Sequence, residues 1–89
     1  MRKPILGSRF KKEVARMERR GKNASKLREI IRLLLEETPL PTHYKDHALS
    51  GKWQRFRDCH IEPDWLLLYK IEGEYLHLVR TGTHADLFG

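Results

Sequence analysis

The stretch Trp65-Leu66-Leu67-Leu68-Tyr69-Lys70-Ile71 decides the fold of this 89-residue chain. Its start is apolar at both odd and even positions, which predicts a strand buried on both faces at the centre of a sheet. Turn signals flank it, with Glu62-Pro63-Asp64 before it and Glu72-Gly73-Glu74 after it. Residues Trp53–His60 and Tyr75–Thr81 have the pattern of the two neighbouring strands, so the second half of the chain predicts an antiparallel meander.

The first half of the chain predicts two helices. Ser8 can cap a helix that runs to about Arg20, and Asn23 can cap a second one that runs to about Glu37. The apolar residues of the second helix recur every three or four positions: Leu27, Ile30, Ile31, Leu34 and Leu35. This order predicts an α+β fold, in which the two helices cover one face of a small twisted antiparallel sheet and the other face is free. Residues 5–6 can add a short edge strand.

Composition bounds the class of protein. The chain is 39% hydrophobic and 34% charged with a net charge of +6, which predicts one folded domain over residues 1–89 and an anionic partner such as nucleic acid. The single Cys59 cannot form an internal disulfide, so we expect a cytoplasmic protein. The apolar run near the N-terminus is too short for a signal peptide, and no run is long enough to cross a bilayer.

Three histidines, His47, His60 and His84, lie in polar segments beside aspartate or arginine. Imidazole both takes and gives a proton near neutral pH, so several of them in a small basic protein suggest acid–base chemistry on RNA. Asp58 lies two residues before His60 on a predicted strand, and the two therefore share a face. On the last strand, Arg80 would share the buried face of its apolar neighbours unless a bulge or the end of the strand re-aims it.

Three segments of the second half carry a resemblance to a known family. Tyr44-Lys45-Asp46-His47-Ala48-Leu49-Ser50-Gly51-Lys52-Trp53 resembles a "KDHxLxGxW" motif, and Arg57-Asp58-Cys59-His60-Ile61-Glu62-Pro63-Asp64-Trp65 resembles an "RDxHxxPDW" motif. Residues 80–89, which read RTGTHADLFG, resemble a C-terminal "RTGTHxxLFG" motif. All three belong to the YafQ branch of the RelE/ParE toxin superfamily, and three collinear motifs are a specific signal.

The resemblance implies a type II toxin that cuts mRNA in the ribosomal decoding site and is silenced by a cognate antitoxin. It implies a catalytic set of histidines, aspartates and one arginine: His47, His60, His84, Asp58, Asp64 and Arg80. It also places the family's C-terminal aromatic residue on Phe88. The chain departs from the family pattern at none of these positions.

The chemistry needs a general base for the 2′-hydroxyl, a group that stabilises charge on the phosphate, and a general acid for the leaving 5′-oxygen. Two of the three histidines can carry the protons, and the sequence leaves open which is base and which is acid. The planar fork of Arg80 suits a phosphate, and either Asp58 or Asp64 can orient an imidazole. We expect further RNA contacts from an aromatic and a basic set: Phe88, Lys45, Lys52, Arg55 and Arg57.

The two helices are crowded with cations, which predicts that they dock on ribosomal RNA of the small subunit or on an acidic antitoxin segment. These residues are Arg9, Lys11, Lys12, Arg16, Arg19, Arg20, Lys22, Lys26, Arg28 and Arg32. We expect a free monomer, no cofactor and no membrane partner. A zinc set made of His43, His47, Cys59 and His60 has no common spacing, and His77 alternates with core residues, so a structural role is expected for it.

Three alternative functions remain open at this stage. A non-catalytic basic domain would bind nucleic acid without needing the histidines. A ParE-like toxin would poison DNA gyrase on the same fold, and it also has no need of them. A free ribonuclease would cut RNA without the ribosome.

Overall fold

The computed structural model describes residues 1–89, and its sheet has five strands in the order β1-β5-β4-β3-β2. The strands are β1 (Lys3–Leu6), β2 (His47–Ala48), β3 (Arg57–Glu62), β4 (Trp65–Glu72) and β5 (Tyr75–Gly82). The stretch that opens β4 is central and buried on both faces. Its apolar residues at both odd and even positions predict this. The predicted meander is confirmed, whereas β1 pairs with β5 in parallel, so the sheet is mixed rather than antiparallel.

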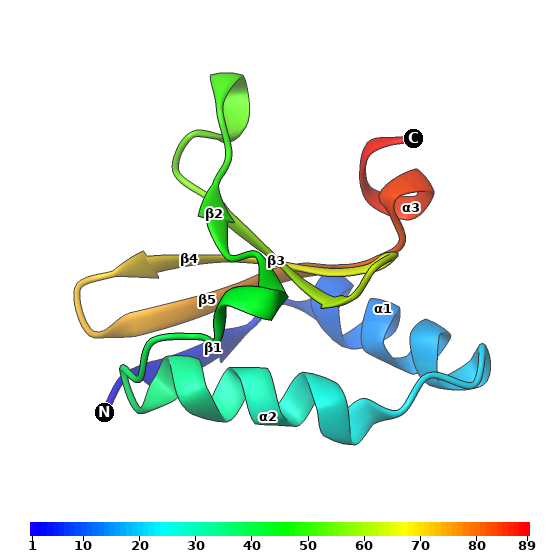
Figure 1. The fold of residues 1–89 in the computed structure, drawn as a ribbon, viewed down its shortest axis with the longest axis horizontal. Coiled ribbons are helices and arrows are strands. Elements are labelled where there is room, and N and C mark those ends of the chain that lie inside the picture. Colours follow the sequence, from blue (N-terminus) through cyan, green and yellow to red (C-terminus); the bar gives the residue numbers. More distant parts are fainter.

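Two long helices cover one face of the sheet, as predicted. Figure 1 shows α1 (Ser8–Arg19) and α2 (Ala24–Leu35) below the sheet. Asn23 caps α2 through its side chain, which accepts a hydrogen bond from the Ser25 N–H at 3.0 Å. Ser8, however, is the first residue of α1, and Gly7 takes the capping position without a side-chain bond. Gly21 ends α1 with a φ of +89°, a conformation that costs glycine little.

The main core lies between these helices and the sheet. The apolar side chains of one parity of β4 point into it, together with the buried stripes of α1 and α2 and one face of β5. The members that fill the most space are Phe10, Met17, Ile30, Trp65, Leu67, Tyr69, Leu76 and Leu78. Trp65 satisfies its indole N–H within this core by donating to the Thr81 hydroxyl at 2.9 Å.

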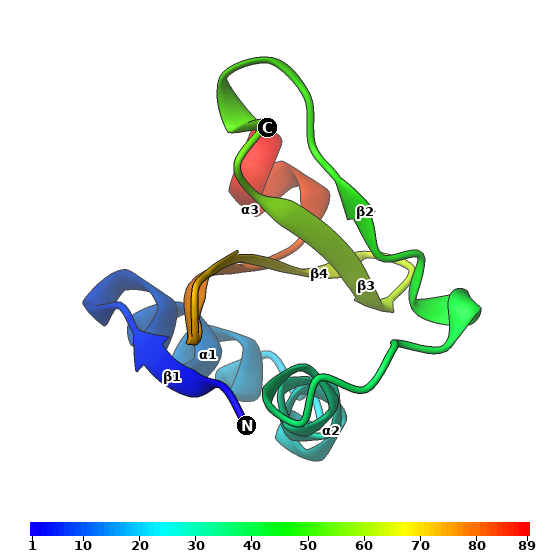
Figure 2. The same ribbon diagram turned by 90° about the vertical axis from the view of Figure 1, so that its left-hand side faces the viewer.

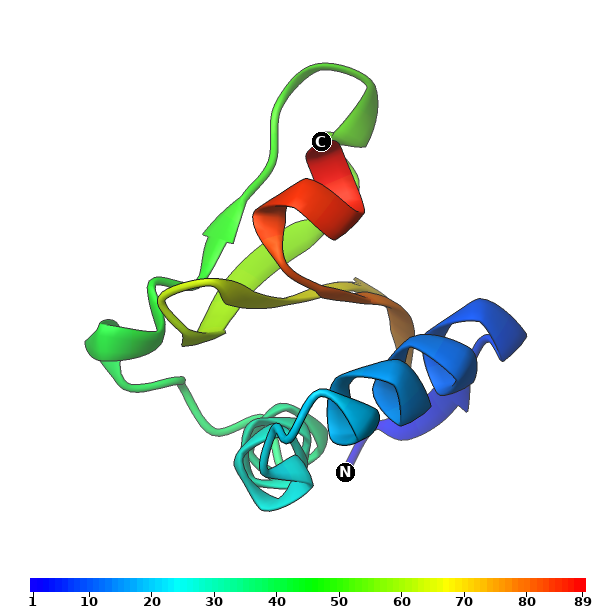
Figure 3. The same ribbon diagram turned by 90° about the vertical axis from the view of Figure 1, so that its right-hand side faces the viewer.

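The opposite face of the sheet is not free, contrary to the sequence prediction. A short C-terminal helix, α3 (His84–Phe88), lies over it together with the segment that follows β2, as Figures 2 and 3 show from two sides. Leu87 packs there against Leu66 and Leu68, with Leu49 and Trp53 at the margin. A capping box begins α3, because Thr83 accepts from the Asp86 N–H and the Asp86 side chain accepts from the Thr83 N–H.

The connector between α2 and β3 is more structured than a loop. It contains two 3₁₀ turns, Thr42–Tyr44 and Gly51–Trp53, and the two-residue strand β2. The predicted strand from Trp53 to His60 is therefore wrong at its start, since β3 begins only at Arg57. Gly51 adopts a positive φ of 65°, and the turn that follows directs Trp53 onto the second face of the sheet.

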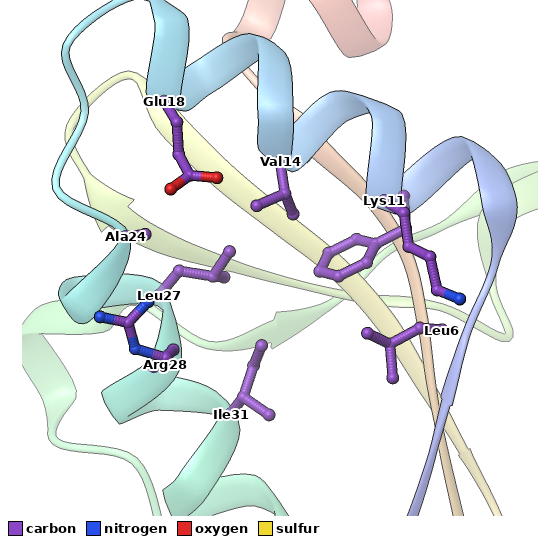
Figure 4. A pocket seen from close by; sticks show the side chains of 9 residues that line it. Leu6, Lys11, Val14, Glu18, Ala24, Leu27, Arg28 and Ile31 are labelled. Carbon is purple, nitrogen blue, oxygen red and sulfur yellow. The ribbon is translucent and has the colours of Figure 1, made fainter.

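A groove of about 250 Å³ runs between α1 and α2. Figure 4 shows Val14 on α1 and Leu27 and Ile31 on α2 facing this groove, with Lys11 and Arg28 at its rim. The groove is thus apolar inside and mainly basic at its edge, although Glu18 also lines it. None of the helices combines the length and the hydrophobicity that a membrane-spanning segment requires.

Candidate active site

Three separate elements bring the histidines together on the α3 side of the sheet. His47 comes from β2, His60 from β3, and His84 is the first residue of α3. The ring of His60 lies 6.3 Å from the ring of His47 and 5.6 Å from that of His84, measured between centroids. Asp58 pairs across the strands with His47 and has the same parity as His60, as the strand alternation predicts.

The ring of His47 is oriented by a backbone carbonyl. Its Nδ1 lies 2.7 Å from the carbonyl oxygen of Lys45. A carbonyl only accepts, so Nδ1 carries the hydrogen and donates, and Nε2 of the neutral ring is left as the acceptor. This Nε2 lies 3.7 Å from Oδ2 of Asp58. His47 therefore presents a proton-accepting nitrogen to the centre of the histidine group.

The ring of His84 is oriented by a carboxylate instead. Its Nδ1 donates to Oδ1 of Asp64 at 2.5 Å, and its backbone N–H donates to the same oxygen at 2.8 Å. These two bonds, the backbone one foremost, lower the pKa of Asp64 below its ordinary value. Asp64 thus stays ionised and holds the hydrogen of the His84 ring on Nδ1, so Nε2 is the nitrogen left for other partners.

Asp58 lies buried beneath the histidines. Its side chain is 7% exposed, and its Oδ1 is buried without a hydrogen-bond partner. Burial raises the pKa of Asp58, while positive charge on His47, His60 and His84 acts in the opposite direction. The site therefore holds one desolvated acidic group whose charge depends on the charges of the rings above it.

Arg80 is held by an ion pair with α1. A bulge at Val79 breaks the alternation of β5, so Arg80 pairs with Leu68 and leaves the face that Leu78 occupies. Its Nε donates to both carboxylate oxygens of Glu13 at 2.9 and 2.8 Å, and its Nη2 lies 2.8 Å from one of them. The Nη2 also donates to the backbone oxygen of Asp86 in α3 at 3.4 Å, whereas Nη1 makes no hydrogen bond within the chain.

The predicted RNA contacts divide into free and engaged residues. Lys45, Lys52 and Arg55 are exposed and make no ion pair within the chain. Phe88 is half-exposed, and its ring meets that of Trp53 edge-on at 6.4 Å. Arg57 is engaged, because its guanidinium donates to Asp46 at 3.2 and 3.3 Å, and its strand parity is opposite to that of Asp58 and His60.

The other histidines lie outside the group. The Nε2 of His77 lies 3.0 Å from a carboxylate oxygen of Glu72 at the surface. His43 lines a polar cavity of about 230 Å³ that also borders His60, together with Lys45, Ile61, Glu62 and Pro63. No three His, Cys, Asp or Glu side chains are grouped closely enough to hold a metal ion.

Two acidic residues of the site region were missed by the sequence analysis. Glu13 lies on the apolar stripe of α1 between Phe10 and Met17, and that position is the signal by which a buried partner of Arg80 could have been found. Asp46 precedes His47 in the first motif, but only the structure shows that it contacts Tyr69 and Arg57.

Comparison with known proteins identifies the family. Residues 2–89 match the model of the bacterial YafQ toxin of type II toxin–antitoxin systems. The chain belongs to the YafQ family. It is 48% identical over 81 residues to the mRNA interferase toxin YafQ of Escherichia coli K12, covering 90% of this chain and 88% of that protein.

Two solved structures have the same fold. One is a copper-bound mutant toxin from Helicobacter pylori, with a TM-score of 0.95, 41% identity and coverage of 99% and 100% of the two chains. The other is YafQ in the E. coli DinJ–YafQ complex, with a TM-score of 0.93, 43% identity and full coverage of both chains.

Proposed function

We propose that the histidine group of this YafQ-family toxin cuts mRNA in the ribosomal A site, by acid–base catalysis in which the 2′-hydroxyl attacks the adjacent phosphate. The family assignment and the 48% identity make the chain an mRNA interferase, which is an endoribonuclease. The proposal adds the residues, the chemistry and the place. The observation that supports it is the pair His47 and His84, whose Nδ1 atoms are held by a neutral carbonyl in one case and by a carboxylate in the other.

His47 acts as the general base in this mechanism. Its Nδ1 hydrogen is bound to a neutral carbonyl, so the neutral ring offers Nε2 to the 2′-hydroxyl proton. When His47 has taken the proton it becomes an imidazolium, and the Asp58 carboxylate 3.7 Å from Nε2 then faces a positive charge. The 2′-oxygen attacks phosphorus, and a 2′,3′-cyclic phosphate forms.

His84 acts as the general acid. The protonated ring keeps its Nδ1–H on Asp64 and delivers its Nε2–H to the leaving 5′-oxygen. His60 lies between the two rings and can donate to the phosphate. Arg80 is the proposed clamp for the charge on the phosphate through Nη1, which has no partner, although its side chain is only 11% exposed and its ion pair with Glu13 offsets part of its charge.

The RNA would follow the exposed residues around the group. Phe88 offers a half-exposed ring on which an unpaired base can stack. Lys45, Lys52 and Arg55 are exposed cations without an ion pair in the chain, and we propose them as phosphate contacts. Arg57 contributes through its contact with Asp46 and not as a free cation, because Asp46 already engages its guanidinium.

The helical surface is proposed to bind ribosomal RNA. Among its ten cations, several are neutralised within the chain, for example Arg20 by Asp86 and Lys26 by Glu62. The ones without an ion pair are Lys11, Lys12, Arg19 and Arg28. Replacing Lys12 by alanine should lower the slope of log affinity against log salt for ribosome binding by about 1. An unchanged slope would exclude Lys12 from the interface.

The same surface suits an antitoxin. The E. coli relative was solved in complex with DinJ, and we propose that this chain likewise binds a cognate antitoxin. The groove between α1 and α2 has an apolar floor and the cations Lys11 and Arg28 at its rim, which fits an amphipathic acidic segment. Such a segment would compete with the ribosome for the same cations.

A modified message tests the chemistry. Programmed ribosomes would carry an mRNA with a single 2′-deoxy nucleotide at the scissile position, and an unmodified mRNA would be the control. We expect the control to yield a 2′,3′-cyclic phosphate or a 3′-phosphate with a free 5′-hydroxyl, and the modified message to stay intact. Equal cleavage of both messages would refute attack by the 2′-hydroxyl.

A further inference from the structure

Asp46 makes three hydrogen bonds to the sheet although it lies beside a proposed catalytic histidine. Its Oδ1 accepts from the Tyr69 hydroxyl at 2.5 Å and from Nε of Arg57 at 3.3 Å, and its Oδ2 accepts from Nη2 of Arg57 at 3.2 Å. Tyr69 belongs to β4 and is buried in the main core. Asp46 therefore joins the segment before β2 to two strands of the sheet.

The alternation of the chain separates Asp46 from its neighbour. Arg57 and Tyr69 pair across β3 and β4, and Tyr69 points to the face that α1 and α2 cover. His47 pairs with Asp58, which has the opposite strand parity, and its ring belongs to the histidine group. The two consecutive side chains thus point to opposite sides of the sheet. Asp46 points to Tyr69 and Arg57, and His47 points to the histidine group.

Little else fixes His47. Its side chain is 51% exposed, and β2 is only two residues long. The ring is held by the carbonyl of Lys45, a residue with a positive φ of 50°. A non-glycine residue keeps that conformation only where its surroundings hold it. Asp46 directly follows Lys45. Its three hydrogen bonds hold the Lys45–Asp46 peptide, so that the Lys45 carbonyl stays on the His47 ring.

We propose that Asp46 is a positioning residue for His47, anchored by Tyr69 and Arg57 and acting through the Lys45 carbonyl. The inference rests on the proposed role of His47 as the base. Asp46 touches neither the reacting atoms nor any histidine side chain, so it is not itself a catalytic residue. It sets which nitrogen of His47 carries the hydrogen and where the other nitrogen points.

The expected kinetic effect follows from misplacing the base. Asp46→Ala should lower kcat by about 10- to 100-fold at saturating ribosomes, as expected for a shift of about 1 Å, with KM little changed. Asp46→Asn keeps an acceptor oxygen for Tyr69 and should recover most of the activity. Tyr69→Phe removes only the hydroxyl and keeps the ring in the core, so it should give a smaller loss of the same kind.

Nuclear magnetic resonance of ¹⁵N-labelled imidazole rings reads the geometry without any cleavage. At a pH where the imidazole rings are neutral, the His47 signals of the wild type should show the hydrogen on Nδ1. Asp46→Ala should mix the two tautomers, and the signals of His77, which lies outside the site, should not change. Unchanged His47 signals would overturn the proposal, even if activity falls.

A double mutant distinguishes positioning from a separate contribution. Asp46→Ala combined with His47→Ala should be no slower than His47→Ala alone, because the anchor acts only through that ring. A further loss in the double mutant would overturn the proposal. If His47→Ala is itself fully active, the proposed base is wrong, while the imidazole spectra still decide whether Asp46 orients the ring. If Asp46→Ala fails to fold, Tyr69→Phe gives the same spectral test.

Discussion

Replacing Asp58 by asparagine should stabilise the fold and impair the enzyme. The side chain is 7% exposed, and its Oδ1 is buried without a hydrogen-bond partner. A buried polar group without a partner costs about 1–3 kcal/mol. Asp58→Asn keeps a polar side chain at this place and removes only the buried charge, so we expect the lower end of this range, a gain of about 1 kcal/mol at pH 8. For a domain of this size, that raises Tm by roughly 4–8 °C.

The pH dependence gives the sign of the effect. Because burial raises the pKa of Asp58, the folded state binds more protons than the unfolded state above the ordinary carboxyl pKa of about 3.9. The wild type therefore loses this part of its stability as pH rises through the raised pKa. Asp58→Asn does not titrate, so its advantage should be full at pH 8 and shrink as pH falls toward 4.

Thermal unfolding followed by circular dichroism measures both effects, and Asp86→Asn is the matched control. The Arg20 side chain and the Thr83 N–H lower the pKa of Asp86, so its carboxylate stabilises the fold at pH 8 and does so less as pH falls. The control should thus lower Tm at pH 8, opposite to Asp58→Asn. A lower Tm for Asp58→Asn at pH 8 would refute the reasoning, since it would mean that the buried carboxylate is a net stabilising group.

Three other substitutions test the packing and the placement of α3. Leu67→Ala removes a fully buried side chain beneath the helices and should lower the free energy of unfolding by about 2–5 kcal/mol in urea. Thr81→Val deprives the Trp65 indole N–H of its acceptor and should cost about 1–3 kcal/mol in the same assay; no change would show that another group satisfies the indole. Gly82→Ala would place a Cβ 2.9 Å from the Asp86 Cβ, which should displace α3 and lower mRNA cleavage by about tenfold or more. Gly7→Ala is the control, because its Cβ meets only an ordinary contact at 3.9 Å and cleavage should be unchanged.

Much of the fold was readable because local patterns decide it. The stretch that begins at Trp65 is apolar at both odd and even positions, which predicted the central strand. The apolar residues that recur every three or four positions from Leu27 predicted α2. The parallel pairing of β1 could not be predicted, because its partner β5 is more than sixty residues away and either orientation suits a short apolar strand. The capping box at Thr83 was a visible signal for α3 that the sequence analysis did not use.

The residues of the site could be predicted only where a sequence motif or the alternation of side chains along a strand determines their position. The three motifs placed His47, His60 and His84 in one group, and alternation placed Asp58 beside them. Single side-chain pairings between distant elements have no such signal. The bond between Arg80 and Glu13 joins residues 67 positions apart, and the bulge that re-aims Arg80 is not encoded by a periodic pattern.

A cleavage assay on ribosomes decides whether the histidine group is the active site. Purified protein and one mRNA would be incubated with and without programmed ribosomes, and cuts would be mapped by primer extension for the wild type, His84→Ala and the control His77→Ala. We expect cuts only with ribosomes, for the wild type and His77→Ala, and a loss of about 10²–10⁴-fold for His84→Ala. Cleavage by His84→Ala at the wild-type rate would contradict the assignment of the histidine group as the active site.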